Sequence, residues 1–219
     1  MPTSRRRVAA VAYDGIVSRY LNRPLSRPAA RLLTRTPVTP NGVTAFTLLL
    51  AVATGVMLAA GWNIAGGIAI QAVSVIDGVD GELARLRNLA TRFGAVFDAV
   101  SDRYADAIII GGMTAYAARF ESHAHPETVG MLALGAALIV SYSRARIEAD
   151  LGKPGQALPE SLDSIFGLAS RDVRSLIAAV GAITGQCYVT LIVLAATSAA
   201  TVAWRLVYLR VRGIGQPAA

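Results

Sequence analysis

Four aspartates near the middle of the chain stand at two regular spacings. Asp77 and Asp80 are three residues apart, and Asp98 and Asp102 are four residues apart. Residues at these spacings share one face of an α-helix, so each pair presents its carboxylates on one side. A short segment rich in arginine and asparagine separates the two pairs. The pattern predicts two antiparallel, neighbouring helices whose four carboxylates meet at one depth.

Four carboxylates so close together must be neutralised. They repel one another strongly in a medium of low dielectric constant, so either protons or cations have to compensate their charge. Clustered carboxylate oxygens are ligands that suit Mg²⁺, Mn²⁺ or Ca²⁺. A divalent cation that also binds phosphate oxygens fits a nucleoside diphosphate substrate. The aspartates therefore indicate metal-assisted phosphate chemistry.

Small residues surround the acids. On membrane helices they permit close packing, and they also leave room for a base and ribose near the backbone. For the small residues, packing alone is the alternative explanation. For the acids, the alternative is that they only form ion pairs with Arg85 and Arg103. The small residues are Gly78, Gly81, Ala84, Gly94, Ala95 and Ala99.

The segments that must position these side chains are apolar. The 219-residue chain is 54% hydrophobic and 16% charged, whereas a soluble domain carries about 25% charged residues. We predict an all-α polytopic membrane protein with six transmembrane helices. The apolar stretches begin and end at about 43–60, 62–76 (continuing as a helix to 87), 93–118, 129–142, 171–184 and 187–209.

A basic segment precedes the first apolar stretch. Residues 13–35 mix arginines with scattered apolar side chains, which predicts an amphipathic juxtamembrane helix on an anionic membrane surface. Pro24 and Pro28 are expected to break it into short pieces. We therefore divide the chain into a basic juxtamembrane segment, 1–36, and a six-helix domain, 37–219.

The arginines also predict the orientation of the helices. The N-terminal segment and the stretches 85–92, 144–174 and 205–212 carry most of the positive charge and fall on one side. By the positive-inside rule, both termini and the acids are cytoplasmic, in the inner membrane of the cell. We therefore attribute the net charge of +7 to contact with an anionic lipid bilayer. No interleaving of basic and aromatic residues indicates a nucleic-acid partner.

The run Asp80-Gly81-x-x-Ala84-Arg85, followed after eight residues by Gly94-x-x-x-Asp98-x-x-x-Asp102, resembles the signature of the CDP-alcohol phosphotransferases at every position. Asp77 also matches. The resemblance implies an enzyme that transfers a phospho-alcohol group from a CDP-alcohol to a second alcohol and releases CMP. It also implies one or two Mg²⁺ or Mn²⁺ ions, and a homodimer.

The resemblance implies a role for each residue of the motif. Asp102 would be the general base that accepts the proton of the acceptor hydroxyl, while also touching metal. The other residues fall into two groups. Asp77, Asp80 and Asp98 would bind the metal ions with Asp102, and Asp77, Gly81, Ala84, Arg85 and Gly94 would bind the nucleotide.

Two arginine pairs are candidates for binding a phosphorylated acceptor. Arg144 and Arg146 end the fourth predicted helix, and Arg171 and Arg174 open the fifth. Guanidinium groups bind phosphate well, although ordinary positive-inside charge is the alternative. The segments around these arginines look like the branches of the family that use inositol 1-phosphate.

The donor and three other functions stay open. The stretches 77–87 and 102–106 look more like the branch whose donor is CDP-inositol. That branch is often fused to a cytidylyltransferase domain, which these residues do not include, so CDP-diacylglycerol also remains possible.

A phosphatidylglycerophosphate synthase, with glycerol 3-phosphate as acceptor, would need the same arginines. A cation-coupled transporter would place its acids at mid-membrane and show repeated halves, and a non-catalytic adaptor would have no need of the acids.

Overall fold

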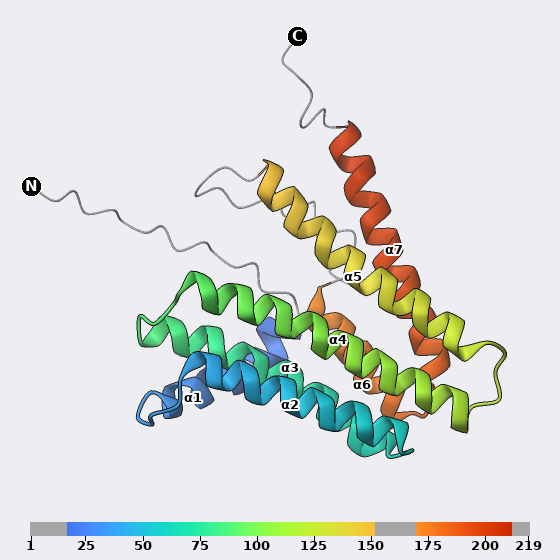
Figure 1. Ribbon diagram of the computed structural model, residues 1–219, viewed down its shortest axis with the longest axis horizontal. Helices are drawn as coiled ribbons and strands as arrows, with labels where there is room; N and C mark the ends of the chain where they lie inside the picture. The colour runs from blue at the N-terminus through green and yellow to red at the C-terminus, as the bar shows by residue number, and fades with distance from the viewer. Residues whose placement is uncertain (1–16, 152–169, 212–219) are drawn as a thin grey trace, which may run out of the picture.

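The computed structural model describes residues 17–151 and 170–211, and all regular structure in these ranges is helical (Figure 1). The all-α class is therefore confirmed for the described residues. A π-helical turn at Ser18–Asn22 leads into α1 (Arg23–Leu33). It is followed by α2 (Pro40–Ala59), α3 (Asn63–Leu86), α4 (Arg92–Phe120), α5 (Pro126–Leu151), α6 (Arg171–Ile183) and α7 (Cys187–Val211).

Each of the six predicted apolar stretches coincides with one helix. Among the described residues, four helices are long and apolar enough to cross a membrane, namely α2, α3, α5 and α7. Helix α4 carries several charged residues in its first half, and α6 has only 13 residues. A polytopic membrane protein is thus supported, and the crossing of the bilayer by α4 and α6 stays a prediction.

The N-terminal helix is more continuous than its prolines indicate. Pro24 lies in the first turn of α1, where no intrahelical partner exists for a backbone N–H, and Pro28 lies inside the helix. The expectation that both prolines break this segment is wrong. Packing supplies the reason, since Ser26 and Ala30 are completely buried where α1 lies against α3.

Helix α2 packs along both α3 and α4, whereas α3 and α4 make few direct backbone contacts with each other (Figure 1). The two aspartate-bearing helices are antiparallel and joined by a short turn, and they bring three of their acids within 4.8 Å of one another, so the prediction of neighbouring helices is confirmed. What the prediction lacks is α2, which lies against both of them.

The crossing of α2 and α4 is very close. A Cβ on Gly112 would lie 2.6 Å from the carbonyl oxygen of Gly55, and a Cβ on Gly55 would lie 2.7 Å from the side chain of Ile108. Only glycine permits such an approach of two helix backbones. This contact fixes α4, and with it Asp98 and Asp102, relative to α2.

The C-terminal helices complete the core. Helix α6 packs against α3 and α7, and α5 packs against α7 and α4. The largest buried side chains of the main apolar cluster are Leu58, Ile70, Met113 and Leu191. This packing places the beginning of α6, which carries Arg171, opposite the aspartates.

Candidate active site

Three of the four predicted aspartates form one cluster of carboxylates. Asp77 on α3 and Asp98 and Asp102 on α4 each offer an oxygen, and these oxygens all lie within 4.8 Å of one another. Their burial is intermediate. Three hard oxygen ligands at this separation fit a divalent cation such as Mg²⁺ or Mn²⁺. The aspartates of α3 and α4 thus come together across the space between the two helices.

Asp80 lies apart from this group of three. It is buried, with 6% of its surface exposed. One of its carboxylate oxygens accepts a hydrogen bond from the Thr44 hydroxyl at 2.5 Å, and the other accepts one from the backbone N–H of Gly81. Both oxygens therefore already have a donor, and Thr44 orients this side chain from α2.

Arg171 is the cation nearest to the carboxylates among the described residues. Its guanidinium pairs with Asp77, lies 2.8 Å from Asp102 and lies 3.6 Å from Asp106. Asp106 also pairs with the buried Arg174 at 2.9 Å. Of the four predicted acceptor arginines, Arg171 therefore contacts the predicted general base, and Arg174 is connected to Arg171 through Asp106.

The formal charge of this cluster is negative. Among the described residues, Asp77, Asp102 and Asp106 pair with Arg103, Arg171 or Arg174, whereas Asp98 and the nearby Asp80 form no ion pair with these three arginines. With every carboxylate ionised, two negative charges remain, which equals the charge of one divalent cation. Buried charges are stable only when paired, so this excess is a second feature that fits a metal ion.

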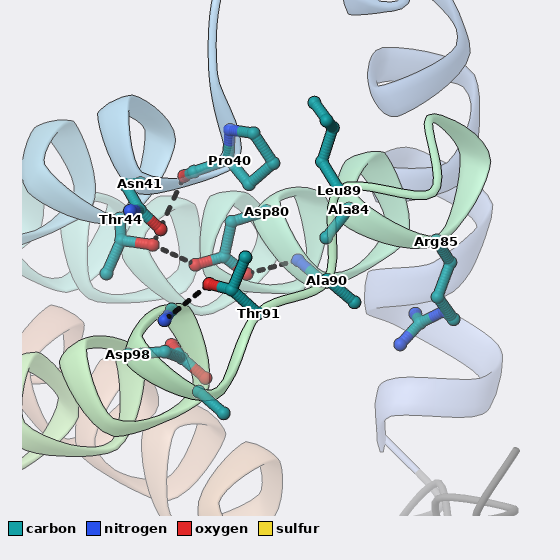
Figure 2. A pocket seen from close by; sticks show the side chains of 13 residues that line it. Pro40, Asn41, Thr44, Asp80, Ala84, Arg85, Leu89, Ala90, Thr91 and Asp98 are labelled. Carbon is teal, nitrogen blue, oxygen red and sulfur yellow. Dashed lines mark hydrogen bonds between the residues drawn. The ribbon is translucent and has the colours of Figure 1, made fainter. Parts of the chain in front are cut away.

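A cavity of about 210 Å³ adjoins the carboxylates, between the beginning of α2, the end of α3 and the beginning of α4. Figure 2 shows Thr44 hydrogen-bonded to Asp80, with Asp98 on the neighbouring helix. Four of the five predicted nucleotide-binding residues line this cavity, namely Gly81, Ala84, Arg85 and Gly94. Asp77 does not line the cavity and belongs to the cluster of three carboxylates instead.

The wall formed by α4 depends on glycine. Thr91 caps this helix by accepting a hydrogen bond from the backbone N–H of Gly94 at 2.9 Å. A Cβ on Gly94 would lie 3.1 Å from both the Asn41 amide oxygen and the Thr91 hydroxyl. Glycine at this position therefore keeps the cavity open between α2 and α4.

Arg85 also lines the cavity, and Figure 2 shows its side chain on the opposite side of Ala84 from Asp80. It pairs with Glu82 at 2.6 Å, and Glu82 also pairs with Arg23 of α1 at 3.1 Å. Helix α1 is thereby connected through one carboxylate to a residue of the motif.

Arg144 and Arg146 are placed differently from Arg171 and Arg174. Each forms an ion pair four residues further along its own helix, with Glu148 and Asp150 respectively, and about half of each side chain is exposed. The structure therefore does not gather the four arginines into one buried cluster. The burial of Arg171 and Arg174 separates them from the other pair.

Two residues near this cluster have no role in the sequence prediction, namely Asp106, which is half-buried, and Arg205, which is buried. Asp106 contacts both arginines of α6, and Arg205 of α7 donates hydrogen bonds to the Val140 carbonyl at 2.6 Å and the Ser143 hydroxyl at 2.9 Å. We had assigned Arg205 to the positive charge at the membrane surface, but it is only 5% exposed. An arginine inside a long apolar helix was the available signal.

Comparison with known proteins agrees with the motif. Residues 37–211 match the model of the CDP-alcohol phosphatidyltransferase family. The chain belongs to this family. The match includes all four aspartates and every described helix from α2 to α7.

Among curated relatives of the chain are proteins of two kinds. A bifunctional IPC transferase and DIPP synthase of Rubrobacter xylanophilus is 41% identical over 81% of this chain, which spans only 38% of that protein's length. A phosphatidylinositol phosphate synthase of Mycobacteroides abscessus is 31% identical, and the matched region covers 88% of this chain and 87% of the synthase.

Solved structures share the fold. The phosphatidylinositol phosphate synthase of Mycobacterium tuberculosis in complex with manganese and citrate is 28% identical, with a TM-score of 0.70 over 89% of this chain and 93% of the other. The same enzyme with CDP-DAG bound gives a TM-score of 0.70 at 27% identity, over 90% of this chain and 99% of the other.

Proposed function

We propose that this protein is a metal-dependent CDP-alcohol phosphotransferase of the membrane that uses inositol 1-phosphate as its acceptor and releases CMP. The observation that carries the proposal is the position of the complete family motif. Its aspartates lie beside a cavity that its glycines and alanine line. The family and the inositol-phosphate relatives support the same reaction.

The proposed metal ligands are Asp77, Asp98 and Asp102, with Asp80 as the fourth. A Mn²⁺-containing relative supports this choice of cofactor. Bound Mg²⁺ or Mn²⁺ would stabilise the negative charge on the transferred phosphoryl group and on the departing CMP. Because Asp80 is held by Thr44 and Gly81, we expect it to keep its orientation whether or not an ion is bound.

Asp102 is the proposed general base. Its carboxylate would accept the proton from the acceptor hydroxyl as that oxygen forms a bond to the phosphorus atom that bears the donor alcohol. The bond from this phosphorus to the CMP oxygen breaks, and CMP leaves with the bonding electron pair. Asp102 suits this role because it belongs to the cluster of three carboxylates and also contacts Arg171.

Arg171 and Arg174 are the proposed ligands of the acceptor phosphate. A phosphate held by Arg171 would lie next to Asp102, because the two side chains are 2.8 Å apart. This arrangement would bring a hydroxyl of the same acceptor within reach of the base. Arg144 and Arg146 are more exposed, so we expect them to attract the acceptor rather than to orient it.

The donor that we favour is CDP-diacylglycerol. An apolar groove of about 540 Å³ lies between α3 and α6, and it includes Ile76, the residue directly before Asp77. Its lining is almost entirely apolar, so it suits an acyl chain better than the polar ring of CDP-inositol. The relative with bound CDP-DAG supports this assignment.

The test is CMP release by the purified protein with Mg²⁺ or Mn²⁺. Two donors, CDP-diacylglycerol and CDP-inositol, are each combined with two acceptors, inositol 1-phosphate and glycerol 3-phosphate. We expect release with CDP-diacylglycerol and inositol 1-phosphate. Release with CDP-inositol would overturn the donor assignment, and release with glycerol 3-phosphate alone would overturn the acceptor. Absence of release from every pair would contradict the proposal.

A further inference from the structure

Two chain segments meet beside the cavity. The turn between α3 and α4, residues 87–91, follows directly after Ala84 and Arg85 and contains Leu89, which also lines the cavity. The linker between α1 and α2, residues 34–39, leads directly into Pro40 and Asn41 on the opposite wall. The two segments therefore carry or directly precede lining residues of two different walls of the cavity.

Arg87 joins the two segments. Its guanidinium donates hydrogen bonds to the carbonyl oxygens of Val38 at 2.7 Å, Leu33 at 2.8 Å and Thr34 at 2.7 Å, and also to that of Thr36. One side chain thus contacts four carbonyls that are about fifty residues away in the sequence. The guanidinium is only half-buried, yet each of its terminal nitrogens has a partner.

Among the described residues, most of these carbonyls have no other donor. Those of Leu33 and Thr34 are at the C-terminal end of α1, where the last carbonyls of a helix carry a partial negative charge, and only that of Leu33 also accepts hydrogen bonds from the backbone N–H and the hydroxyl of Thr36. Those of Thr36 and Val38 belong to the linker, which has no regular structure to satisfy them. The planar fork of an arginine reaches several acceptors at once, which a lysine ammonium cannot do with the same geometry.

The linker transmits this attachment to the cavity. Thr39, its last residue, caps α2 by accepting a hydrogen bond from the backbone N–H of Gly42 at 3.1 Å. Asn41 in the first turn of α2 is therefore oriented by a linker that Arg87 holds. Thr44, one turn later, donates the hydrogen bond to Asp80.

We propose that Arg87 is a positioning residue for nucleotide binding: it fixes the 34–39 linker against the end of α3 and thereby holds Asn41 opposite Ala84 and Leu89. Arg87 itself does not line the cavity, so it acts through Asn41. This inference rests on the proposed function, because it assumes that the cavity binds the cytidine nucleotide of the donor.

The experiment measures CDP affinity by calorimetry in detergent with Mg²⁺, for the full-length protein and its Arg87→Gln and Arg87→Lys variants. Losing the hydrogen bonds of a charged group should weaken CDP binding about tenfold in Arg87→Gln, with partial rescue in Arg87→Lys. The KM of the donor should rise, whereas the KM of the acceptor should not change. A role confined to stabilising α1 would lower the melting temperature without this difference.

Two further variants make the test specific. Arg119→Gln is the matched control, because Arg119 donates to the Ala59 carbonyl at the other end of α2, far from the cavity. It should leave CDP affinity unchanged. A double-mutant cycle with Asn41→Ala should be non-additive, since Arg87 is proposed to act through Asn41.

The outcomes separate this inference from the proposed function. If wild-type protein neither binds CDP nor releases CMP, the proposed function is wrong and the positioning role falls with it. If wild-type protein binds CDP and Arg87→Gln binds it equally well, only the positioning role is wrong. Additive effects in the cycle with Asn41 would also overturn it.

Discussion

At the scale of single residues, charge determines how the site is arranged. Asp77 and Asp102 share Arg171, and Asp106 connects Arg171 to Arg174. Removal of one partner from a buried ion pair leaves an uncompensated charge, which is costly. Substitutions at these residues therefore need a measurement of melting temperature beside the kinetics, so that a loss of folding is distinguished from a loss of chemistry.

Asp102→Asn keeps the shape of the side chain and removes its ability to accept a proton. We expect turnover to fall below detection, while binding of CDP with Mg²⁺ remains close to that of the wild type because Asp77, Asp80 and Asp98 are retained. CMP release and calorimetry measure these two properties. Glu127→Gln in the exposed first turn of α5 is the control. Undiminished turnover in Asp102→Asn would remove Asp102 from the role of base.

Arg171→Ala and Arg146→Ala compare the buried and the exposed arginine pairs. Loss of a charge-assisted contact to phosphate should raise the acceptor KM about tenfold or more for Arg171→Ala, and clearly less for Arg146→Ala. Initial rates at varied inositol 1-phosphate and varied donor give both KM values. A rise confined to the donor KM would assign these arginines to the diphosphate instead.

At the scale of secondary structure, α2 is the element that aligns the site. It packs on both α3 and α4, supplies Asn41 and Thr44, and contacts α4 through Gly55. Because α3 and α4 make few contacts with each other, the distance between their carboxylates depends on how each of them lies against α2. The catalytic geometry is therefore sensitive to a contact deep inside the helix packing.

Gly112→Ala should disturb this contact. The added methyl group would lie 2.6 Å from the carbonyl oxygen of Gly55, so the helices have to separate. Overpacking of this kind typically costs about 1–3 kcal/mol of stability. We expect a lower melting temperature in detergent and reduced CMP release.

The neighbouring glycine provides a matched control for that variant. Beyond its chain neighbours and the adjacent backbone of α4, a Cβ on Gly111 would have no heavy atom within 4 Å, so Gly111→Ala should leave melting temperature and activity close to those of the wild type. Equal losses in the two variants would show that the α2–α4 contact is not responsible, because alanine favours a helix more than glycine does and cannot lower stability by that route.

At the scale of the whole molecule, the distribution of arginines predicts an orientation. The turn between α3 and α4 and the ends of α5 and α7 should face the cytoplasm, together with the carboxylates. The loop between α4 and α5, residues 121–125, should face the opposite side. The homodimer that the family resemblance implies stays a prediction at this scale.

Labelling of introduced cysteines tests this orientation. Ser122→Cys in the outer loop should react with a membrane-impermeant maleimide on intact cells, whereas Ala29→Cys on α1 should react only after the cells are broken. The native Cys187 is completely buried and should not react in either case. Reaction of Ala29→Cys on intact cells would reverse the predicted orientation.

The sequence by itself determined the helices, the motif and the family. Apolar stretches of membrane-spanning length predict helices whatever surrounds them, and the spacings of the aspartates fix which side chains share a helix face. Gly81, Ala84, Arg85 and Gly94, which the family motif assigns to the nucleotide, line one cavity, and their role in binding stays a prediction. The helices and their shared faces depend on local periodicity, which a single chain displays directly.

Only the tertiary structure decided what stands between the helices. It showed that α2 joins α3 and α4, that Arg171 and Arg174 are buried among acids while Arg144 and Arg146 are exposed, and that Arg205 is enclosed. It also showed that Arg87 contacts a linker about fifty residues away. Apart from Arg205, these arginines lie near helix ends, where a buried and an exposed arginine have the same local sequence pattern. Its burial and its partners depend on which helices lie against it, and helical periodicity does not contain that information.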